Sequence, residues 1–147
     1  MTPLAKLILG VAILLLPAVV HGQLKAPSNM VKKFQGFKVK EKFTADTIIY
    51  YSGSADVALR PALNEKINLA AEDFQRIVMS GNATDEDYQD QIKIGLERFS
   101  DIYDSLDTED RERICAYFEE LMDIVGLESS GGYLNRFMYG FDPTVKP

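Results

Sequence analysis

The chain has 147 residues, and its 16 Lys or Arg and 22 Asp or Glu residues give a formal net charge of −6 at pH 7. This acidic balance argues against nucleic-acid binding, because phosphate groups require a basic footprint on the protein. The sequence contains one His, one Cys and no Trp, which excludes an intramolecular disulfide and removes much of the usual catalytic equipment.

The first 22 residues have the pattern of a secretory signal peptide. Lys6 precedes an uninterrupted apolar run from Leu7 to Val20, and the small residue Gly22 ends the segment. The run is 14 residues long, whereas a membrane-spanning helix needs roughly 20. We therefore expect cleavage after residue 22, an extracytoplasmic (periplasmic or secreted) location and no transmembrane span in the mature chain. Cleavage would also remove His21, the chain's only histidine.

Residues 23–56 form a basic N-terminal segment whose secondary structure is ambiguous. Its first part, residues 23–43, contains six Lys and one Glu. Alternation of apolar residues with Lys from Phe37 to Phe43 has the period of a strand, whereas the spacing of Met30, Phe34 and Phe37 has the period of a helix. A short helix from about residue 28 is the favoured prediction, followed by an irregular linker.

Residues 57–140 are predicted to form a helical core. Four apolar stripes with helical spacing occupy residues 63–78, 88–106, 114–125 and 133–138. Pro61, Thr84 and Asp107 favour helix starts before the first three stripes. The expected fold is all-α, a small antiparallel bundle of three long helices plus short terminal helices, with residues 141–147 as a C-terminal tail.

Several segments of the chain have a pattern found in an uncharacterised family. The segments are Asp123-Ile124-Val125-Gly126, Gly132-Tyr133-Leu134-Asn135-Arg136-Phe137-Met138-Tyr139-Gly140 and Arg60-Pro61. In these segments the chain resembles a family of small exported bacterial domains with no assigned function. The resemblance implies a helical domain and no particular mechanism.

The residue content argues against most catalytic and metal chemistry. Without a histidine in the mature chain, a Ser or Cys nucleophile lacks its usual general base. Cys115 lies on the apolar side of a predicted helix with Phe118, which indicates a buried structural thiol. Zinc lacks ligands, and the acidic residues 85–90 lack the glycine and closing Glu of a calcium loop. These features favour a non-enzymatic protein without metal or cofactor.

Two places in the sequence are candidates for ligand or partner contacts. Tyr50 and Tyr51 lie in an irregular stretch, where binding residues are common, although both rings could instead cap the bundle. Gly131 and Gly132 precede the last predicted helix and could direct backbone N–H groups at an anion, with Arg136 one turn further on. An ordinary helix start is the alternative for that second place.

A third candidate is an acidic surface. Residues 85–123 contain 14 Asp or Glu and four Lys or Arg. Helical periodicity places many of these carboxylates on the solvent sides of the second and third long helices, with Asp101, Asp104, Glu112 and Glu119 as representative members. If the two helices pack side by side, they present a broad negative surface that attracts a cationic partner. The alternative is a solvated face that only keeps the protein soluble.

These features together predict an exported, non-catalytic binding protein of the inhibitor or immunity type, whose acidic surface recognises a cationic protein partner. A hydrolase that uses a pair of carboxylates is one alternative. Another is association with a membrane surface through the lysines of residues 23–43, with Phe34, Phe37 and Phe43 as apolar anchors. The sequence leaves open the oligomeric state and the use of Asn82-Ala83-Thr84 as a glycosylation site.

Overall fold

Residues 28–140 form five α-helices and two single-turn 3₁₀ helices. The computed structural model describes residues 28–140, so the predicted signal peptide (1–22) and tail (141–147) lie outside the described residues. The helices are α1 (Ser28–Val39), η1 (Val57–Leu59), α2 (Arg60–Ser80), α3 (Asp85–Glu97), η2 (Tyr103–Ser105), α4 (Thr108–Val125) and α5 (Tyr133–Tyr139). Residues 28–140 contain no strand, which confirms the all-α prediction and the helical interpretation of α1.

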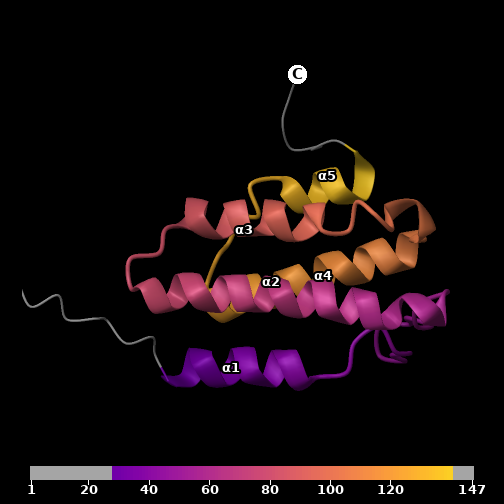
Figure 1. Ribbon diagram of the computed structural model, residues 1–147, viewed down its shortest axis with the longest axis horizontal. Coiled ribbons are helices and arrows are strands. Elements are labelled where there is room, and N and C mark those ends of the chain that lie inside the picture. The colour runs from indigo at the N-terminus through magenta and orange to yellow at the C-terminus, as the bar shows by residue number, and fades with distance from the viewer. Residues whose placement is uncertain (1–27, 141–147) are drawn as a thin grey trace, which may run out of the picture.

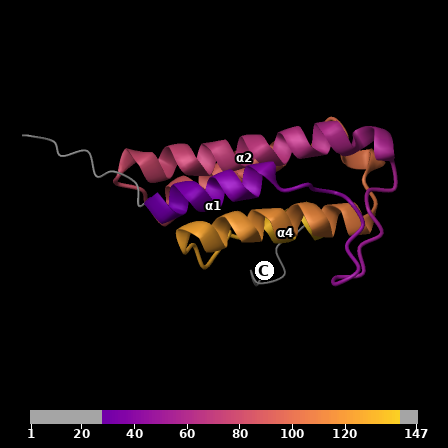
Figure 2. The same cartoon turned by 90° about the horizontal axis from the view of Figure 1, so that it is seen from below.

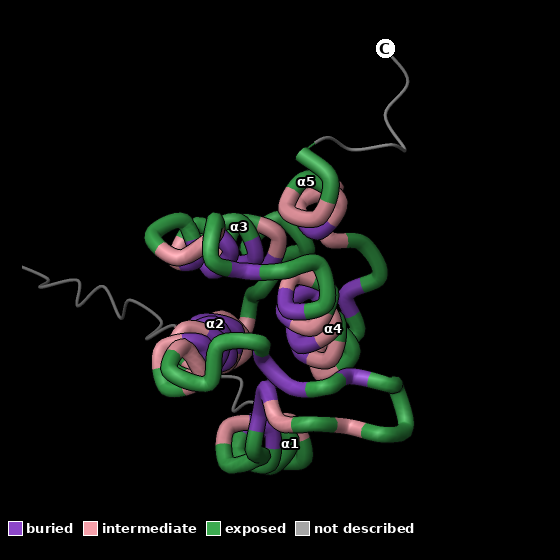
Figure 3. The backbone as a smooth tube through the Cα atoms, turned by 90° about the vertical axis from the view of Figure 1, so that its right-hand side faces the viewer, coloured by how far each residue is buried: buried purple, intermediate pink, exposed green. Residues whose placement is uncertain are grey.

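The α-helices lie along one common direction in three layers (Figure 1). The end-on view shows α1 as one outer layer, α2 and α4 as the middle layer, and α3 and α5 as the other outer layer (Figure 3). The chain reverses at each connection, so α1, α3 and α5 run one way and α2 and α4 the other. Figure 2 shows α1 packed over both α2 and α4. The predicted antiparallel packing therefore holds for α2 and α3, whereas α2 and α4 are parallel neighbours.

The helix boundaries follow the capping residues of the sequence. Thr84 Oγ1 accepts the Asp87 N–H at 3.3 Å and the Asp87 carboxylate accepts the Thr84 N–H at 2.8 Å, which forms the predicted capping box of α3. Asp107 caps α4 by accepting the Asp110 N–H at 2.8 Å. Gly126 ends α4 at φ 76°, a left-handed conformation that favours glycine.

The third helix ends earlier than its apolar stripe predicts. The stripe continues to Leu106, but α3 stops at Glu97 and the chain turns before η2. Lys66 of α2 donates to the Arg98 carbonyl oxygen at 2.7 Å, so a side chain from another helix satisfies a carbonyl at this end. Neither Gly nor Pro marks the stop. Tertiary contacts therefore set this boundary.

The apolar stripes meet in one continuous core. The buried members of the predicted stripes are Leu63, Ile67, Ala70, Phe74, Tyr88, Ile92, Leu96, Phe99, Leu106, Ile114, Phe118, Leu121 and Leu134. Gly95 of α3 lets the Phe118 ring of α4 lie against its backbone, because a Cβ at Gly95 would be 2.7 Å from Phe118 Cζ. A glycine in a helix interior costs up to about 1 kcal/mol, and the close approach explains its presence here.

The segment from α1 to the loop before η1 is held partly by buried polar groups. Lys42 is 1% exposed, and its ammonium donates to the carbonyl oxygens of Phe37 (2.6 Å) and Lys40 (3.0 Å) at the end of α1. Burial lowers the pKa of Lys42 to about 8, with the positive charge of Lys40 as a second cause. Phe43, at φ 58°, donates its N–H to the Tyr117 hydroxyl at 3.0 Å.

Candidate functional site

A short loop extends from one end of the bundle between α1 and η1 (Figure 2). Asp46 and Tyr51 form an isolated antiparallel bridge, with N–H···O distances of 2.8 and 2.9 Å. Within the turn that they close, the Ile48 N–H donates to Asp46 Oδ1 at 3.0 Å. The two tyrosines that the sequence suggests as binding residues differ in exposure, because Tyr51 is 6% exposed and Tyr50 is 91% exposed.

The base of this loop is attached to α4 through one buried carboxylate. Asp110 is 1% exposed, and it accepts hydrogen bonds from the Tyr51 hydroxyl at 2.7 Å and the Ser54 hydroxyl at 3.4 Å. Burial raises the pKa of Asp110, and burial together with the Asp110 hydrogen bond raises the pKa of Tyr51. Ser52 adds a bond to Glu109 at 3.1 Å. These contacts hold the base of the loop against α4, and the tip of the loop projects from this base.

The tip of the loop exposes apolar side chains beside carboxylates. Ile48 is 87% exposed and Ile49 is 50% exposed, next to the fully projecting Tyr50. Tyr50 also has φ 57°, a conformation that costs a non-glycine residue roughly 1–2 kcal/mol. Glu109 and Glu112 border a hollow of about 390 Å³ between the loop and α4. We call Ile48, Ile49, Tyr50, Glu109 and Glu112 the loop surface.

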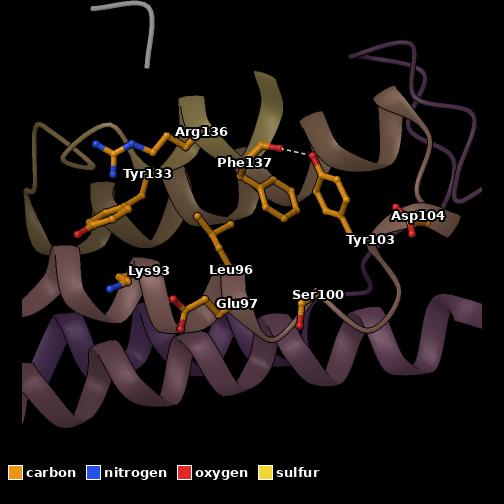
Figure 4. A pocket seen from close by; sticks show the side chains of 9 residues that line it. All are labelled: Lys93, Leu96, Glu97, Ser100, Tyr103, Asp104, Tyr133, Arg136 and Phe137. Atoms are coloured by element: carbon orange, nitrogen blue, oxygen red, sulfur yellow. Dashed lines mark hydrogen bonds between the residues drawn. The ribbon is translucent and has the colours of Figure 1, made fainter. Parts of the chain in front are cut away.

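A second hollow, of about 550 Å³, lies between α3 and α5 and is closed at one end by η2 (Figure 4). Its apolar lining comes from Leu96, Tyr103 and Phe137. The Tyr103 hydroxyl donates to the Phe137 carbonyl at 2.6 Å, and the two rings meet edge to face with centroids 5.2 Å apart. These contacts join η2 to α5, so the hollow has a fixed wall.

Charged groups are arranged around the rim of this α3/α5 hollow. Lys93, Arg136 and the Tyr133 hydroxyl lie at one end, whereas Asp104 lies at the other (Figure 4). Glu97 lies one helical turn beyond Lys93 on α3. The Arg136 guanidinium is 5.4 Å from the centre of the Tyr133 ring. Within residues 28–140, neither cation of this hollow has an ion-pair partner.

The four representative carboxylates of the predicted acidic surface have different surroundings. Asp101 follows the end of α3 and pairs with Lys66 at 3.0 Å. Asp104 lines the α3/α5 hollow, Glu112 borders the loop surface, and Glu119 lines a separate hollow near the end of α4. A single acidic surface that binds a cationic partner stays a prediction.

At the predicted anion site before α5, two backbone N–H groups already have acceptors within the chain. The Gly131 N–H donates to Ser129 Oγ at 3.2 Å, and the Tyr133 N–H donates to the Ser130 carbonyl at 3.3 Å. Gly131 and Gly132 have φ values of 65° and 80°, and a Cβ at Gly131 would be 3.2 Å from the Gln89 side chain. These glycines serve the turn between α4 and α5. Arg136 instead belongs to the rim of the α3/α5 hollow.

The three Phe side chains that the membrane-surface hypothesis uses as apolar anchors are buried in the protein. Phe34, Phe37 and Phe43 are each at most 5% exposed, because the aromatic rings pack inward around Tyr117 and the rest of the core. Lys40 is paired with Glu120 at 2.7 Å. Between residues 28 and 140, no helix combines the length and the apolar character needed to cross a bilayer.

The hypothesis of a carboxylate-pair hydrolase needs a catalytic acid that substrate can reach. Burial raises the pKa of Asp110, but this carboxyl is closed off from solvent by the loop base. Over residues 28–140, His, Cys, Asp and Glu side chains form no group suited to a metal ion. Asp110 is thus a structural anchor, and its position could not be distinguished in the sequence from the other acids around the start of α4.

Cys115 lies in the core, as its position on the apolar side of α4 predicts. The thiol is 7% exposed, and its sulfur lies 3.8 Å from the Leu134 carbonyl oxygen. Burial, together with the negative charges of Glu119 and Glu112, raises the pKa of the Cys115 thiol to about 12. A thiol with this pKa is not a nucleophile at neutral pH.

The layered helices, the anchored loop and the α3/α5 hollow define a small all-α domain. The chain matches the family described as "Domain of unknown function (DUF4844)" over residues 25–142. It therefore belongs to this family, which confirms the resemblance to an uncharacterised domain family. No curated protein matches the chain.

A solved structure shares both the sequence pattern and the fold. It is the crystal structure of a DUF3571 family protein from Acinetobacter baumannii AYE, with 35% sequence identity and a TM-score of 0.70. The similarity covers 77% of this chain and 90% of that one. The shared helical architecture extends over nearly the whole of the bacterial protein, and its description assigns no activity.

Proposed function

We propose that this chain is an exported binding protein that uses the loop surface to dock onto a cationic protein. The observation that carries the proposal is an exposed apolar tip on a stiff base. Ile48 and Tyr50 are 87% and 91% exposed, while Tyr51 beneath them is fixed to a buried carboxylate. A projecting, pre-organised loop loses little conformational entropy on binding, which favours affinity.

The side chains of the tip are of the kind that dominate protein interfaces. Tyrosine combines a large apolar ring with a hydroxyl, and such residues supply a large share of binding energy when a partner encloses them. The strained backbone of Tyr50, at φ 57°, points the same way, because strain of this kind collects at functional sites. An apolar pocket on the partner would accept Ile48 and Tyr50 together.

The charge around the tip determines the chemistry of the partner. Glu109 and Glu112 stand on α4 directly beside the tip, and residues 28–140 contain 13 Lys or Arg against 21 Asp or Glu. A partner with a basic rim around its apolar pocket is complementary to this arrangement and is steered toward it at long range. This patch is a small part of the acidic surface that the sequence predicted.

Affinity capture from the extracytoplasmic fraction, followed by binding kinetics with the captured protein, tests the proposal. Tyr50→Ala and Ile48→Ser should each weaken binding by roughly 30-fold, which corresponds to about 2 kcal/mol for a central interface residue. Met79→Ser is the control, because Met79 is an apolar residue, 61% exposed, in the last turn of α2 at the opposite end of the bundle. A partner whose affinity is unchanged by both tip variants would contradict the proposed surface.

Neutralisation of one carboxylate on the loop surface, followed by measurement of the association rate at different salt concentrations, tests the cationic nature of the partner. Glu112→Gln should slow association at low salt and have little effect at high salt, because salt screens exposed charges over about 8–10 Å. Glu72→Gln, at an exposed carboxylate of α2, should leave the association rate unchanged. Equal association rates at low and high salt would contradict electrostatic steering.

The export part of the proposal has a separate test. N-terminal sequencing of the protein from its native compartment should give a chain that begins at Gln23. An intact Met1 in a soluble cytoplasmic pool would contradict export and leave the binding test of the loop surface unaffected.

A further inference from the structure

We infer that the hollow between α3 and α5 is a binding site for an amphipathic organic carboxylate, a small molecule with one carboxylate on an apolar body. This site is separate from the loop surface and does not depend on it. The hollow has a volume of about 550 Å³, within the roughly 300–1,000 Å³ of typical small-molecule sites. Its shape and its charges point to the same ligand class.

The apolar part of such a ligand has a suitable surface in the hollow. Leu96 of α3, Tyr103 of η2 and Phe137 of α5 line it from three elements. Phe137 is braced by Phe99, with ring centroids 6.1 Å apart, and by Tyr103 at 5.2 Å. Because these rings support one another, the apolar wall is formed before a ligand arrives, and binding would not require its reorganisation.

The carboxylate of the ligand has a suitable position at one end. Lys93 and Arg136 come from opposite walls and lie on either side of the Tyr133 side chain at this end (Figure 4). Neither cation is paired with a carboxylate of residues 28–140. The contact of Arg136 with the Tyr133 ring, at 5.4 Å, holds the guanidinium at this end. An arginine and a lysine placed in this way favour a carboxylate over a neutral or cationic headgroup.

The remaining charges orient the ligand and limit its affinity. Asp104 stands at the opposite end and repels a second anionic group, so one end of the hollow selects the carboxylate (Figure 4). Glu97 lies between the ends on α3 and opposes the bound anion. The arrangement therefore predicts that neutralisation of Arg136 weakens the binding of the carboxylate ligand, whereas neutralisation of Glu97 strengthens it.

Isothermal titration of the purified protein with decanoate, below its micelle concentration, tests this inference. Arg136→Gln and Lys93→Gln should each weaken decanoate binding by roughly five- to tenfold, as the loss of one charge-assisted contact at a solvent-accessible rim implies. Glu97→Gln should strengthen binding by about twofold or more. Lys32→Gln, at an exposed lysine on the remote α1, is the matched control and should change nothing.

Two further probes make the outcome decisive. Decyltrimethylammonium, with the same chain and the opposite charge, should not bind, and acetate alone should bind far more weakly than decanoate. Equal binding of the cationic and anionic amphiphiles would overturn the inference, as would equal effects of Arg136→Gln and Lys32→Gln.

Discussion

The two halves of this molecule are held together by different forces. The helices α2 to α5 pack through apolar stripes, with Phe118 against Gly95 at a close contact between α3 and α4. Residues 28–54 pack their aromatic rings on the same core, but buried polar groups determine the path of the chain. Lys42 caps the end of α1, Tyr117 accepts the Phe43 N–H, and Asp110 holds the loop.

This difference shows how the chain can combine a stable body with a projecting binding loop. Apolar packing is non-directional and fixes layers of helices, whereas hydrogen bonds to buried groups fix particular backbone conformations. The two left-handed non-glycine residues, Phe43 and Tyr50, both lie in the polar-anchored segment. Substitutions in the two halves should therefore have different consequences.

The largest effect is expected in the apolar half. Phe118→Ala should lower the free energy of unfolding by about 3–5 kcal/mol, because it removes a fully buried ring and leaves a cavity between α3 and α4. Urea denaturation measures the change, with Val39→Ala as the exposed control. Gly95→Ala in the Phe118→Ala background should cost less than in the wild type, since the clash at 2.7 Å is gone. Equal costs in both backgrounds would contradict the proposed contact.

The next largest effect is expected at the anchor of the polar half. Asp110→Ala should destabilise the protein by about 1–3 kcal/mol, because it leaves the buried Tyr51 hydroxyl without its acceptor, whereas the Ser54 hydroxyl can still donate to the Asp56 carbonyl at 3.2 Å. It should also expose the 46–54 loop to proteolysis before the bundle unfolds. Asp110→Asn keeps an acceptor for Tyr51 and should cost clearly less. A loop that stays protected in Asp110→Ala would show that apolar contacts alone hold it.

An effect of similar or smaller size is expected at the single thiol. Cys115→Ser should destabilise by about 1–3 kcal/mol, because it places a hydroxyl in an apolar site. Thiol reagents should label Cys115 only after unfolding, since the group is 7% exposed and its pKa is raised to about 12. Fast labelling of the native protein would be inconsistent with a core position.

The smallest effect is a pH dependence in the polar half. The pKa of Lys42 falls from an ordinary value of 10.5 to about 8 in the folded protein, so the unfolded chain binds more protons between these values. The contribution of Lys42 to stability should therefore rise with pH from about 8, by about 1 kcal/mol up to pH ~9.5. The difference in stability between the wild type and Lys42→Met measures this contribution, because the raised pKa of Cys115 lowers the stability of both proteins over the same range. A difference that does not change with pH would show that Lys42 stays charged when buried.

The sequence by itself determined the helices and most of their limits. Apolar spacing placed Leu63, Ile92 and Ile114 in the core, because side chains on one face of a helix must share one environment. The caps at Thr84 and Asp107 followed from side-chain chemistry that acts within a few residues. The family resemblance could also be found in the sequence, since each motif segment is a short run of consecutive residues.

Only the tertiary structure decided where the chain turns without a local signal and which charges meet. The end of α3 depends on Lys66 from another helix, and the different exposure of Tyr50 and Tyr51 depends on Asp110, far away in sequence. The α3/α5 hollow brings Lys93 and Arg136 together although no spacing in the sequence relates them. Local periodicity reports which side of a helix is apolar, but the partner of each polar group is fixed by long-range packing, and that packing places both proposed binding sites.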